Sequence, residues 1–481
     1  MSISQSLSNA LTGLSANSRM AEVVSANLSN AMTDGYGRRT VELSAQNIGS
    51  QSGGVRVDGV LRASDRGLLS DRRLADAGMA GAEKNAAALK QLEAAFSAPD
   101  DPSGLGARLT ALETALSGAA TDPSSGQRLG QVLSRLGDVT ARLGTASRTV
   151  QSMRVSADAD IARDVETLNA TLKQVQQLNE DIGRVRGRGT DASALMDQRQ
   201  RAIDTIASIV PVREIAQSNG SVSLWTPSGQ PLLDGQAVEI GFIPATVITP
   251  DMTLASGGLR GLTINGVPAG TDGVGRLGGG SLGSAFALRD VSLVQAQTGL
   301  DEVAADLISR FADPAVDPTL AAGDPGLLTD AGVAYDPANL VGLSQRVAVN
   351  AAVDPQRGGS LGRLRDGMQA GTAGPVGNPD QLNRFADALS ERRSISAGIS
   401  QSTAAGQIAR IADLFASQRI RAEEQQSFAT ARRDTLLSAE LATGVDTDFE
   451  LQSLLRVEQA YAANAKVVET IQALMQRLMD I

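Results

Sequence analysis

The sequence predicts a mainly α protein with a small β insertion. We expect a long antiparallel helical bundle or coiled-coil body, with N- and C-terminal helices paired as a stalk. Apolar residues alternate at spacings of three and four near both ends and through the middle of the chain, which is typical of packed helices. β-formers cluster between about 212 and 280, and aromatic residues make up only 2% of the 481 residues.

A stripe of apolar residues predicts the first helix, within residues 1–33. Its candidate interface positions are Ile3, Leu7, Leu14, Asn17, Val24 and Leu28. Asn17 occupies a core-type position, where a buried amide tends to fix the register and the partner of a coiled coil at some cost in stability. A place at the solvated edge of the stripe is the alternative for this residue.

A matching stripe predicts a helix within residues 446–481, with Thr447 and Glu450 as its capping box. Its candidate interface positions are Leu454, Val457, Tyr461, Asn464, Val468, Ile471, Met475 and Leu478. The positions from both stripes together are called the predicted seam. Two helices bury only one face of each other, and a seam over 454–478 is roughly 37 Å long at about 1.5 Å per residue. The stalk is therefore expected to need neighbouring molecules.

The remaining sequence divides into three expected parts. Residues 34–59 are predicted to be a linker loop or extended segment. A helical body is expected over 60–211 and 281–445, because apolar heptad positions continue from Leu129 to Ile182 and helical patterning returns after the insertion. Residues 212–280 are predicted to form a small β-rich inserted domain, because strand-like runs alternate there with turn signals such as PSGQ and ING.

The composition narrows the range of functions. The chain has 43 basic and 53 acidic residues, a net charge of −10, which argues against nucleic-acid binding. It has no Cys and no His, which excludes thiolate nucleophiles, histidine bases and Cys/His zinc sites. We predict no catalytic residue, cofactor site or metal site, and no insertion into a membrane. Without a secretory signal, the ordinary targeting patterns would predict a cytoplasmic protein.

One segment near the N-terminus is more specific than these patterns. Residues 26–39 read ANLSNAMTDGYGRR and closely resemble the signature of bacterial flagellar rod, hook and hook-associated proteins. In that family an amphipathic helix ends in an Asn-rich turn before Gly-Tyr, and Asn27, Asn30, Gly35 and Tyr36 occupy the matching places. Asp34 stands where proline is common in the family.

The C-terminal segment resembles the signature at the other end of the same family. Its most characteristic part is QAYAANAKVV, residues 459–468, and Phe449 stands where the family is commonly acidic. Between the ends, GVRVDGVLRASDRGLL, DASALMDQRQRAIDTIASIV, GGGSLGSAFALRDV and QRVAVNAAVDP resemble segments of the family member that joins hook to filament.

This resemblance implies a structural junction protein that filament assembly requires. The implied partners are further copies in a ring, the hook protein, the next hook-associated protein on the filament side, and an export chaperone at the C-terminal region. The implied location is extracellular, at the hook-filament junction, after type III export without a cleaved signal peptide. Two alternatives remain: another axial protein, such as the hook or distal rod protein, and, in a different class, a coiled-coil sensor or adhesin.

Overall fold

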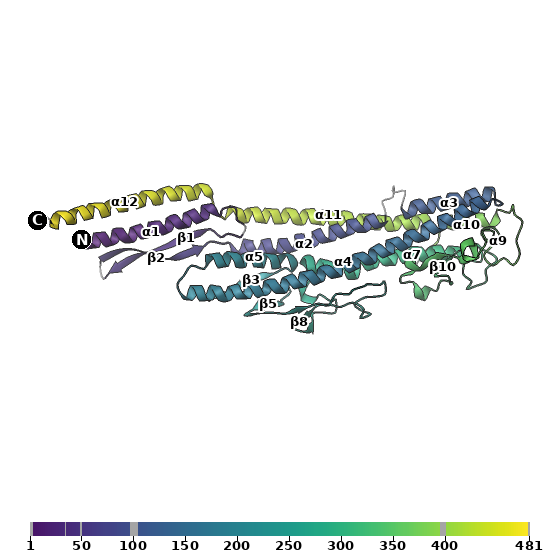
Figure 1. Cartoon of the computed structure of the whole chain (residues 1–481), viewed down its shortest axis with the longest axis horizontal. Helices are drawn as coiled ribbons and strands as arrows, with labels where there is room; N and C mark the ends of the chain where they lie inside the picture. Colours follow the sequence, from purple (N-terminus) through teal and green to yellow (C-terminus); the bar gives the residue numbers. More distant parts are fainter. Residues whose placement is uncertain (1–2, 34, 49–50, 97–103, 395–400, 480–481) are drawn as a thin grey trace.

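The computed structural model describes residues 3–33, 35–48, 51–96, 104–394 and 401–479. The chain forms a long rod that carries its two termini at the same end (Figure 1). Helices make up most of the described residues, so the predicted mainly α fold is confirmed. Within those ranges, no helix combines the length and the apolar character that crossing a lipid bilayer requires.

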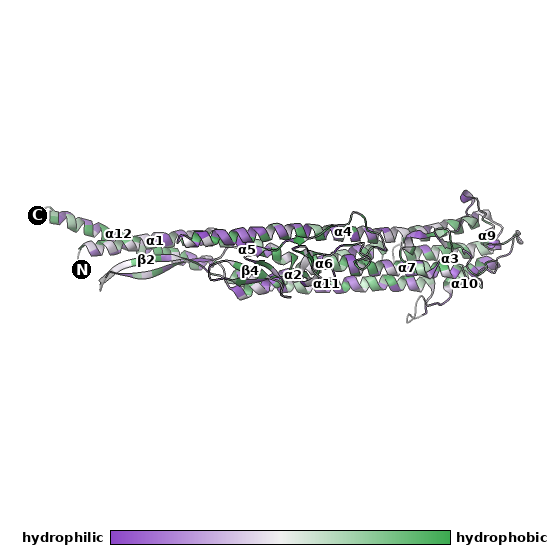
Figure 2. Cartoon of the chain, turned by 90° about the horizontal axis from the view of Figure 1, so that it is seen from below, coloured by the Kyte–Doolittle hydropathy of each residue, from purple (hydrophilic) through white to green (hydrophobic). Residues whose placement is uncertain are grey.

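The stalk consists of two antiparallel helices, α1 (Ile3–Ser29) and α12 (Thr447–Met479). The opposite chain directions follow from two contacts. A Cβ atom added at Gly13 in α1 would lie 2.8 Å from the Nδ2 atom of Asn464, whereas Arg38, beyond the end of α1, bonds Glu450 at the start of α12. Figure 2 shows hydrophobic and hydrophilic residues interspersed along α12, which extends beyond the start of α1.

A β-hairpin follows α1 and packs along it. The strands β1 (Arg39–Ile48) and β2 (Gln51–Arg62) pair antiparallel, and the backbone N–H of Val55 donates to Thr12 Oγ1 at 3.3 Å. Of the two forms expected for residues 34–59, the described part is mainly extended, and pairing of its two strands satisfies their backbone hydrogen bonds. The next helix begins later than residue 60, since Asp65 accepts a hydrogen bond from the N–H of Leu68 and caps that helix.

The body is a bundle of long helices. They are α2 (Arg66–Phe96), α3 (Leu105–Thr121), α4 (Gly126–Gly187), α5 (Ser193–Ile209), α7 (Leu293–Phe311) and α11 (Ala404–Ala442). Shorter helices are α6 (Gly280–Ala287) and α10 (Asp380–Ser390). Helix α11 packs along α2, so the returning chain lies against the first body helix before it enters α12.

Helix α4 is the longest element in the body. Its 62 residues span about 93 Å at about 1.5 Å per residue, and the Ser125 side chain caps its start by accepting from the N–H of Arg128. The expected heptad positions from Leu129 to Ile182 are buried along this helix, so the long helix predicted from the apolar spacing is confirmed. Buried side chains along this helix contribute to the apolar interior at both ends of the body.

The β insertion lies against the helices instead of projecting from them. The strands β3 (Arg213–Ala216), β4 (Val222–Trp225), β5 (Pro231–Asp234) and β6 (Gln236–Ala237) form one antiparallel sheet in that order. The strands β7 (Ile240–Gly241), β8 (Thr263–Ile264) and β9 (Val267–Pro268) form another. Buried side chains from these sheets join those of α4 and α5 in one core, so residues 212–280 are packed into the body.

Arg154 of α4 fixes a loop of the insertion in place. Its fully buried guanidinium donates to the carbonyl oxygens of Thr249 at 3.2 Å and Met252 at 2.6 Å. It also donates to the carbonyl oxygen of Arg289 at 3.0 Å. Burial lowers the pKa of Arg154, and these carbonyl groups provide the polar contacts that a buried cation needs. The loop is therefore bonded to the helix as well as packed against it.

The second half of the body is less helical than expected for residues 281–445. Between α7 and α10 the chain forms loops, short helical turns and a small antiparallel pair, β10 (Leu328–Asp330) with β11 (Val347–Val349). Turn-forming residues explain part of this difference: the Asn350 and Asp354 side chains each accept a backbone N–H two residues ahead. Such local hydrogen bonds compete with a continuous helix.

Candidate assembly site

The predicted seam is only partly covered within one chain. Buried positions are Asn17, Val24, Val457 and Ile471; partly buried positions are Leu7, Leu14, Leu28, Leu454, Asn464 and Val468; exposed positions are Ile3, Tyr461, Met475 and Leu478. Pairing of α1 with α12 therefore covers most seam positions at least in part, and leaves exposed Tyr461 in the middle of α12 and the positions at the tip. The described part of this chain leaves these exposed positions in contact with solvent.

The two seam asparagines lie at different levels of the stalk. Asn464 is partly buried and packs against Gly13, where the absence of a side chain leaves room for its amide. Asn17 is 6% exposed, and its Nδ2 atom has no hydrogen-bond partner among the described residues. A buried donor without a partner destabilises a fold by about 1–3 kcal/mol. The amide of Asn17 therefore carries a cost within the single chain.

Helix α12 also exposes apolar residues outside the predicted seam. Leu455 is 59% exposed and lies on the opposite side from Val457, because successive helical residues are about 100° apart. Leu474 is 47% exposed and lies beside the seam, three residues after Ile471. Sequence reasoning missed these positions because it followed a single stripe. Their exposure makes α12 apolar on more than the face that α1 covers.

A compact polar joint connects the stalk to the body, and Asn27 is at its centre. This residue is 1% exposed. Its Nδ2 atom donates to the carbonyl oxygen of Arg39 at 2.8 Å, while its Oδ1 atom accepts from the Arg39 N–H and the Tyr36 hydroxyl, each at 2.9 Å. One amide therefore bonds the end of α1 to the first residue of β1.

The other family-motif residues shape the turn between these elements. Asn30 donates from its side chain to the carbonyl oxygen of Ala26 at 2.9 Å, at the end of α1. Gly35 has a φ of +74°, a conformation that favours glycine. The Tyr36 ring lies 4.8 Å from the Arg39 guanidinium, and burial raises the pKa of the Tyr36 hydroxyl. Asp34, the departure from the family pattern, lies outside the described residues.

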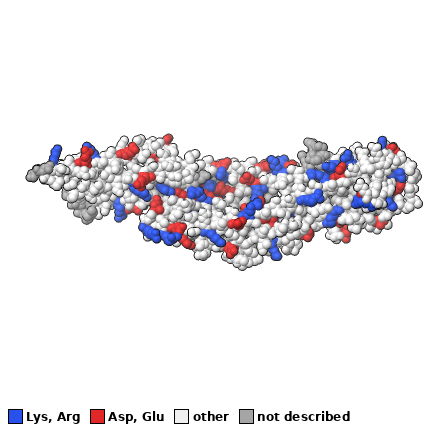
Figure 3. All heavy atoms as spheres, viewed as in Figure 1, with Lys and Arg blue, Asp and Glu red and all other residues white. Residues whose placement is uncertain are grey.

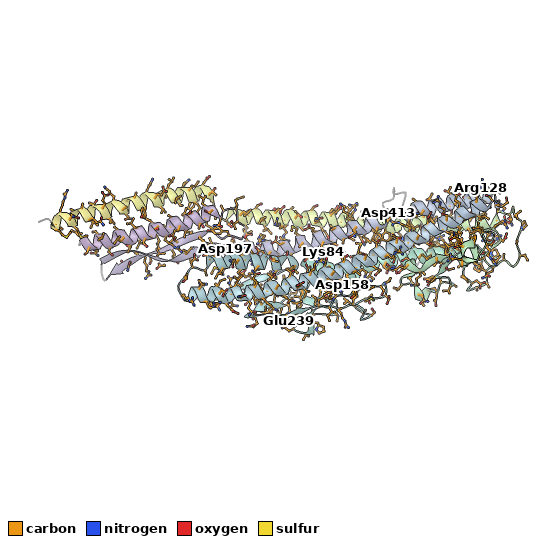
Figure 4. All side chains as sticks on the ribbon, in the orientation of Figure 1. Lys84, Arg128, Asp158, Asp197, Glu239 and Asp413 are labelled. Atoms are coloured by element: carbon orange, nitrogen blue, oxygen red, sulfur yellow. The ribbon has the colours of Figure 1, made fainter. Side chains whose placement is uncertain are left out.

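Asp197 holds the joint from the body side. It belongs to α5, is 4% exposed, and lies where the body approaches the hairpin (Figure 4). Its carboxylate accepts from the Gly37 N–H at 3.1 Å, from Arg62 at 2.7 Å and from Arg39 at 2.8 Å. Sequence reasoning did not select Asp197. One feature of the sequence could have identified it: Asp197 and Gln200 are polar residues spaced three apart, and both lie on the side of α5 that carries Ile203.

Helix α12 is attached to the same joint by an ion pair. Arg38 donates to Glu450 Oε1 at 2.8 Å, and its guanidinium lies 4.8 Å from the centre of the Phe449 ring. The departure at Phe449 thus supplies a ring on which the arginine stacks. Glu450 is occupied by this contact, and Asp446 caps α12 instead, accepting from the N–H groups of Asp448 and Phe449. The predicted capping box of Thr447 and Glu450 is therefore wrong.

A second charge network lies at the adjoining end of the body. Arg72 of α2 pairs with Asp76, with Asp204 of α5 and with Glu440 of α11. Burial raises the pKa of Glu440, while the charge of Arg72 opposes that shift. Because partly buried ion pairs are screened less by salt than exposed pairs, these contacts hold the three helices together near the stalk.

The arrangement as a whole is suited to binding other proteins. Across the described ranges, no group of three or more acidic residues is arranged to hold a metal ion. The features brought together at this end are an apolar helix pair with uncovered faces and a polar joint that fixes its attachment to the body. These features are typical of a subunit that packs against other subunits.

Comparison with known proteins finds two flagellar family models that match parts of this chain. Residues 89–315 match the family described as "Flagellar hook-associated protein FlgK helical domain". Residues 441–481, which include α12, match the family described as "Flagellar basal body rod FlgEFG protein C-terminal". The helical body and the terminal helix thus each resemble a part of a flagellar protein.

The individual relatives are more specific. The flagellar hook-associated protein 1 of Salmonella typhimurium is 26% identical over 265 residues, covering 53% of this chain and 47% of the relative. The protein of that name from Bacillus subtilis is 27% identical over 236 residues, covering 46% of each chain. Over about half of its length the chain is similar to flagellar hook-associated protein 1, which confirms the resemblance found in the sequence.

The match is partial in length. The chain spans about half the length of the curated relatives that it matches. A solved structure, the flagellar hook junction protein FlgK from Burkholderia pseudomallei, is 21% identical and covers 55% of this chain and 47% of that one, with a TM-score of 0.45.

Proposed function

We propose that this chain is a structural component of the bacterial flagellum that joins the hook to the filament and is required for filament assembly. The single observation that supports this most strongly is the stalk. Its C-terminal helix matches an axial-protein family and keeps large apolar residues exposed in the single chain. In an axial assembly, neighbouring stalks would bury these residues, and the gain would be about 25 cal/mol per Å² of apolar surface removed from water.

The proposal assigns partners to the surfaces described above. Further copies pack around the stalk in a ring, through the predicted seam and through Leu455 and Leu474. The hook protein and the next hook-associated protein contact the two ends of this ring. An export chaperone binds the C-terminal region before assembly, which shields the exposed face of α12. The chain acts without catalysis, outside the cell, after type III export without a cleaved signal peptide.

Helix α12 provides a direct test. Leu474→Asp places a charge on an exposed face, so we expect the monomer to keep its unfolding free energy to within about 0.5 kcal/mol, as for most surface changes. In the assembled junction the same carboxylate would be buried without a partner, a cost of several kcal/mol. Cells that carry L474D should export the protein but bear hooks without filaments, as seen by electron microscopy.

Gln472→Asp is the matched control, because it adds the same charge at an exposed polar position two residues away. Cells with Q472D should keep normal filaments. Normal filaments in L474D cells would contradict the proposed role of this face. Loss of export in L474D would instead assign the residue to the chaperone contact, and the amount of protein secreted separates this result from failed assembly.

The runner-up within the class is another axial protein, such as the hook or distal rod protein. The match of residues 89–315 to the FlgK helical domain favours the junction role. A strain that lacks this chain distinguishes the two proposals. Complete hooks that release filament subunits into the medium support a junction protein, whereas rods without hooks support the alternative.

A further inference from the structure

A deep cleft lies beside the joint, where the hairpin, the body and the β insertion meet. Its volume is about 430 Å³. The end of β2, the first turns of α2, the end of α4, helix α5 and strand β3 all contribute to its walls. The assembly role proposed above does not use this cleft. A ligand here would contact two segments that are far apart in the sequence, residues 62–73 and 186–222.

The charge of the cleft differs from that of the molecule. The chain has a net charge of −10, and acidic and basic side chains are interspersed along the face shown in Figure 3. The cleft, by contrast, is lined by several arginines and by Glu214 as its acidic residue. These arginines are Arg62, Arg66, Arg73, Arg186 and Arg199. A concave site with an excess of guanidinium groups attracts anions, since low-dielectric walls focus the field.

The floor of the cleft has donors that the protein does not satisfy. Arg73 is 1% exposed; it donates to Asp204 at 2.7 Å and to Glu214 at 2.6 Å, but one terminal nitrogen is buried without a partner among the described residues. Arg199 is also buried, and it donates to neutral acceptors, Asn179 Oδ1 at 2.8 Å and the Gly220 carbonyl oxygen at 2.9 Å. A buried guanidinium without a carboxylate bonded to it is costly.

The rim adds two exposed cations. Neither Arg66 nor Arg186 forms an ion pair with another described residue. The guanidinium of Arg186 lies over Gly220, where an added Cβ atom would come within 2.3 Å of it. Arg66 is the first residue of α2, so it lies beside the positive end of a 31-residue helix. Burial lowers the pKa of Arg199; the charge of Glu214 opposes that shift, and the charges of nearby arginines add to it.

We propose that this cleft binds an oxyanion carrying two or more negative charges. Guanidinium groups present paired N–H donors that match phosphate and carboxylate oxygens, so both chemistries fit the same walls. A bound anion would satisfy Arg73 and balance the charge of Arg199. It would also bridge the hairpin, α2, α5 and the insertion, and thereby stiffen the attachment of the stalk to the body.

Calorimetric titration of the full chain at low ionic strength tests the site. The probes are inorganic phosphate, pyrophosphate, succinate and citrate, with sodium chloride at matched ionic strength as the blank. We expect saturable binding of one anion per chain. Arg66→Gln with Arg186→Gln should weaken it by at least about tenfold, because charge-assisted hydrogen bonds are lost at residues that hold no other partner. The bound anion should also raise the unfolding free energy of the unchanged chain.

The control is Arg163→Gln with Arg188→Gln, which removes the same charge from exposed positions outside the cleft lining. This variant should bind as the unchanged chain does. Binding of the phosphates alone assigns a phosphate ligand, and binding of the carboxylates alone assigns a carboxylate ligand; either supports the site. No saturable binding of any probe, or equal weakening in both double variants, would overturn it. None of these measurements depends on flagellar assembly, so the outcome is independent of the proposed function.

Discussion

Asn27 shows how one residue can fix the connection between stalk and body. Its amide is small enough to be buried at the end of α1, and its donor and acceptor both bond the backbone of Arg39. An aspartate could accept these hydrogen bonds but could not donate to the Arg39 carbonyl, and an alanine could do neither. The chemistry of the position therefore requires asparagine.

Replacing Asn27 by alanine should loosen the joint. The change leaves the Arg39 N–H, the Arg39 carbonyl and the Tyr36 hydroxyl without their partner, at about 1–3 kcal/mol for each buried group. We expect amide hydrogen exchange at Arg39 to become at least about tenfold faster, as local opening requires less free energy. Asn30→Ala is the control, since the described partners of the Asn30 side chain, Ala26 and Thr33, lie in its own turn. Equal acceleration in both variants would contradict the central role of Asn27.

Residues at the joint differ in how far sequence reasoning could identify them. Asn27 and Tyr36 were found because they belong to a local motif with recognisable spacing. Asp197 was not, because its partners Gly37, Arg39 and Arg62 precede it by at least 135 residues and meet it only in the folded chain. A local sequence pattern cannot show which residues far apart in the chain come into contact in the fold.

At the scale of elements, apolar spacing predicted the long helices well and predicted their ends poorly. Helix α4 was recognisable because its buried apolar positions recur over many turns. The pair β10–β11 was not, because strands of three residues are too short to show an alternation. The cap of α12 was not predictable in the same way, because several polar residues near its start could accept N–H groups of the first turn. Glu450 is not the one that does so, since its carboxylate is bonded to Arg38.

The corrected cap of α12 can be tested by comparing neighbouring residues. Asp446→Ala removes the acceptor of two N–H groups, so the first turn of α12 should lose about 1 kcal/mol. Thr447→Ala should have little effect on that turn. Hydrogen exchange at the amides of Asp448 and Phe449 measures both variants. A larger acceleration in T447A than in D446A would restore the capping box expected from the sequence.

At the scale of the whole molecule, stability is unevenly distributed along the rod. The body has two extensive apolar cores, whereas α12 buries only Glu450, Val457 and Ile471 among its described residues. Regions with few buried apolar contacts open at a lower free energy than the core. The stalk is therefore the part of the isolated chain that is held least firmly, although its helices are formed.

Limited proteolysis of the isolated chain should reveal this difference. We expect the first cuts within α1 and α12, and a fragment containing α2 to α11 that resists further digestion. Mass spectrometry of the products identifies the cleavage sites. Since an open segment must be long enough to enter the protease, cuts should appear in α4 only at much longer times. Equal rates of cleavage in α12 and α4 would show that the stalk is as firmly held as the body.

The pairing of the two terminal helices also determines which surfaces stay uncovered in an incomplete chain. Arg38 and Glu450, which join the hairpin to α12, are 412 residues apart, and the body lies between them in the sequence. Any chain cut or terminated before α12 keeps α1 and the hairpin but has no helix to pair with them. In such a fragment the apolar side of the first helix stays uncovered. Only a chain that carries both terminal helices therefore covers the apolar side of α1.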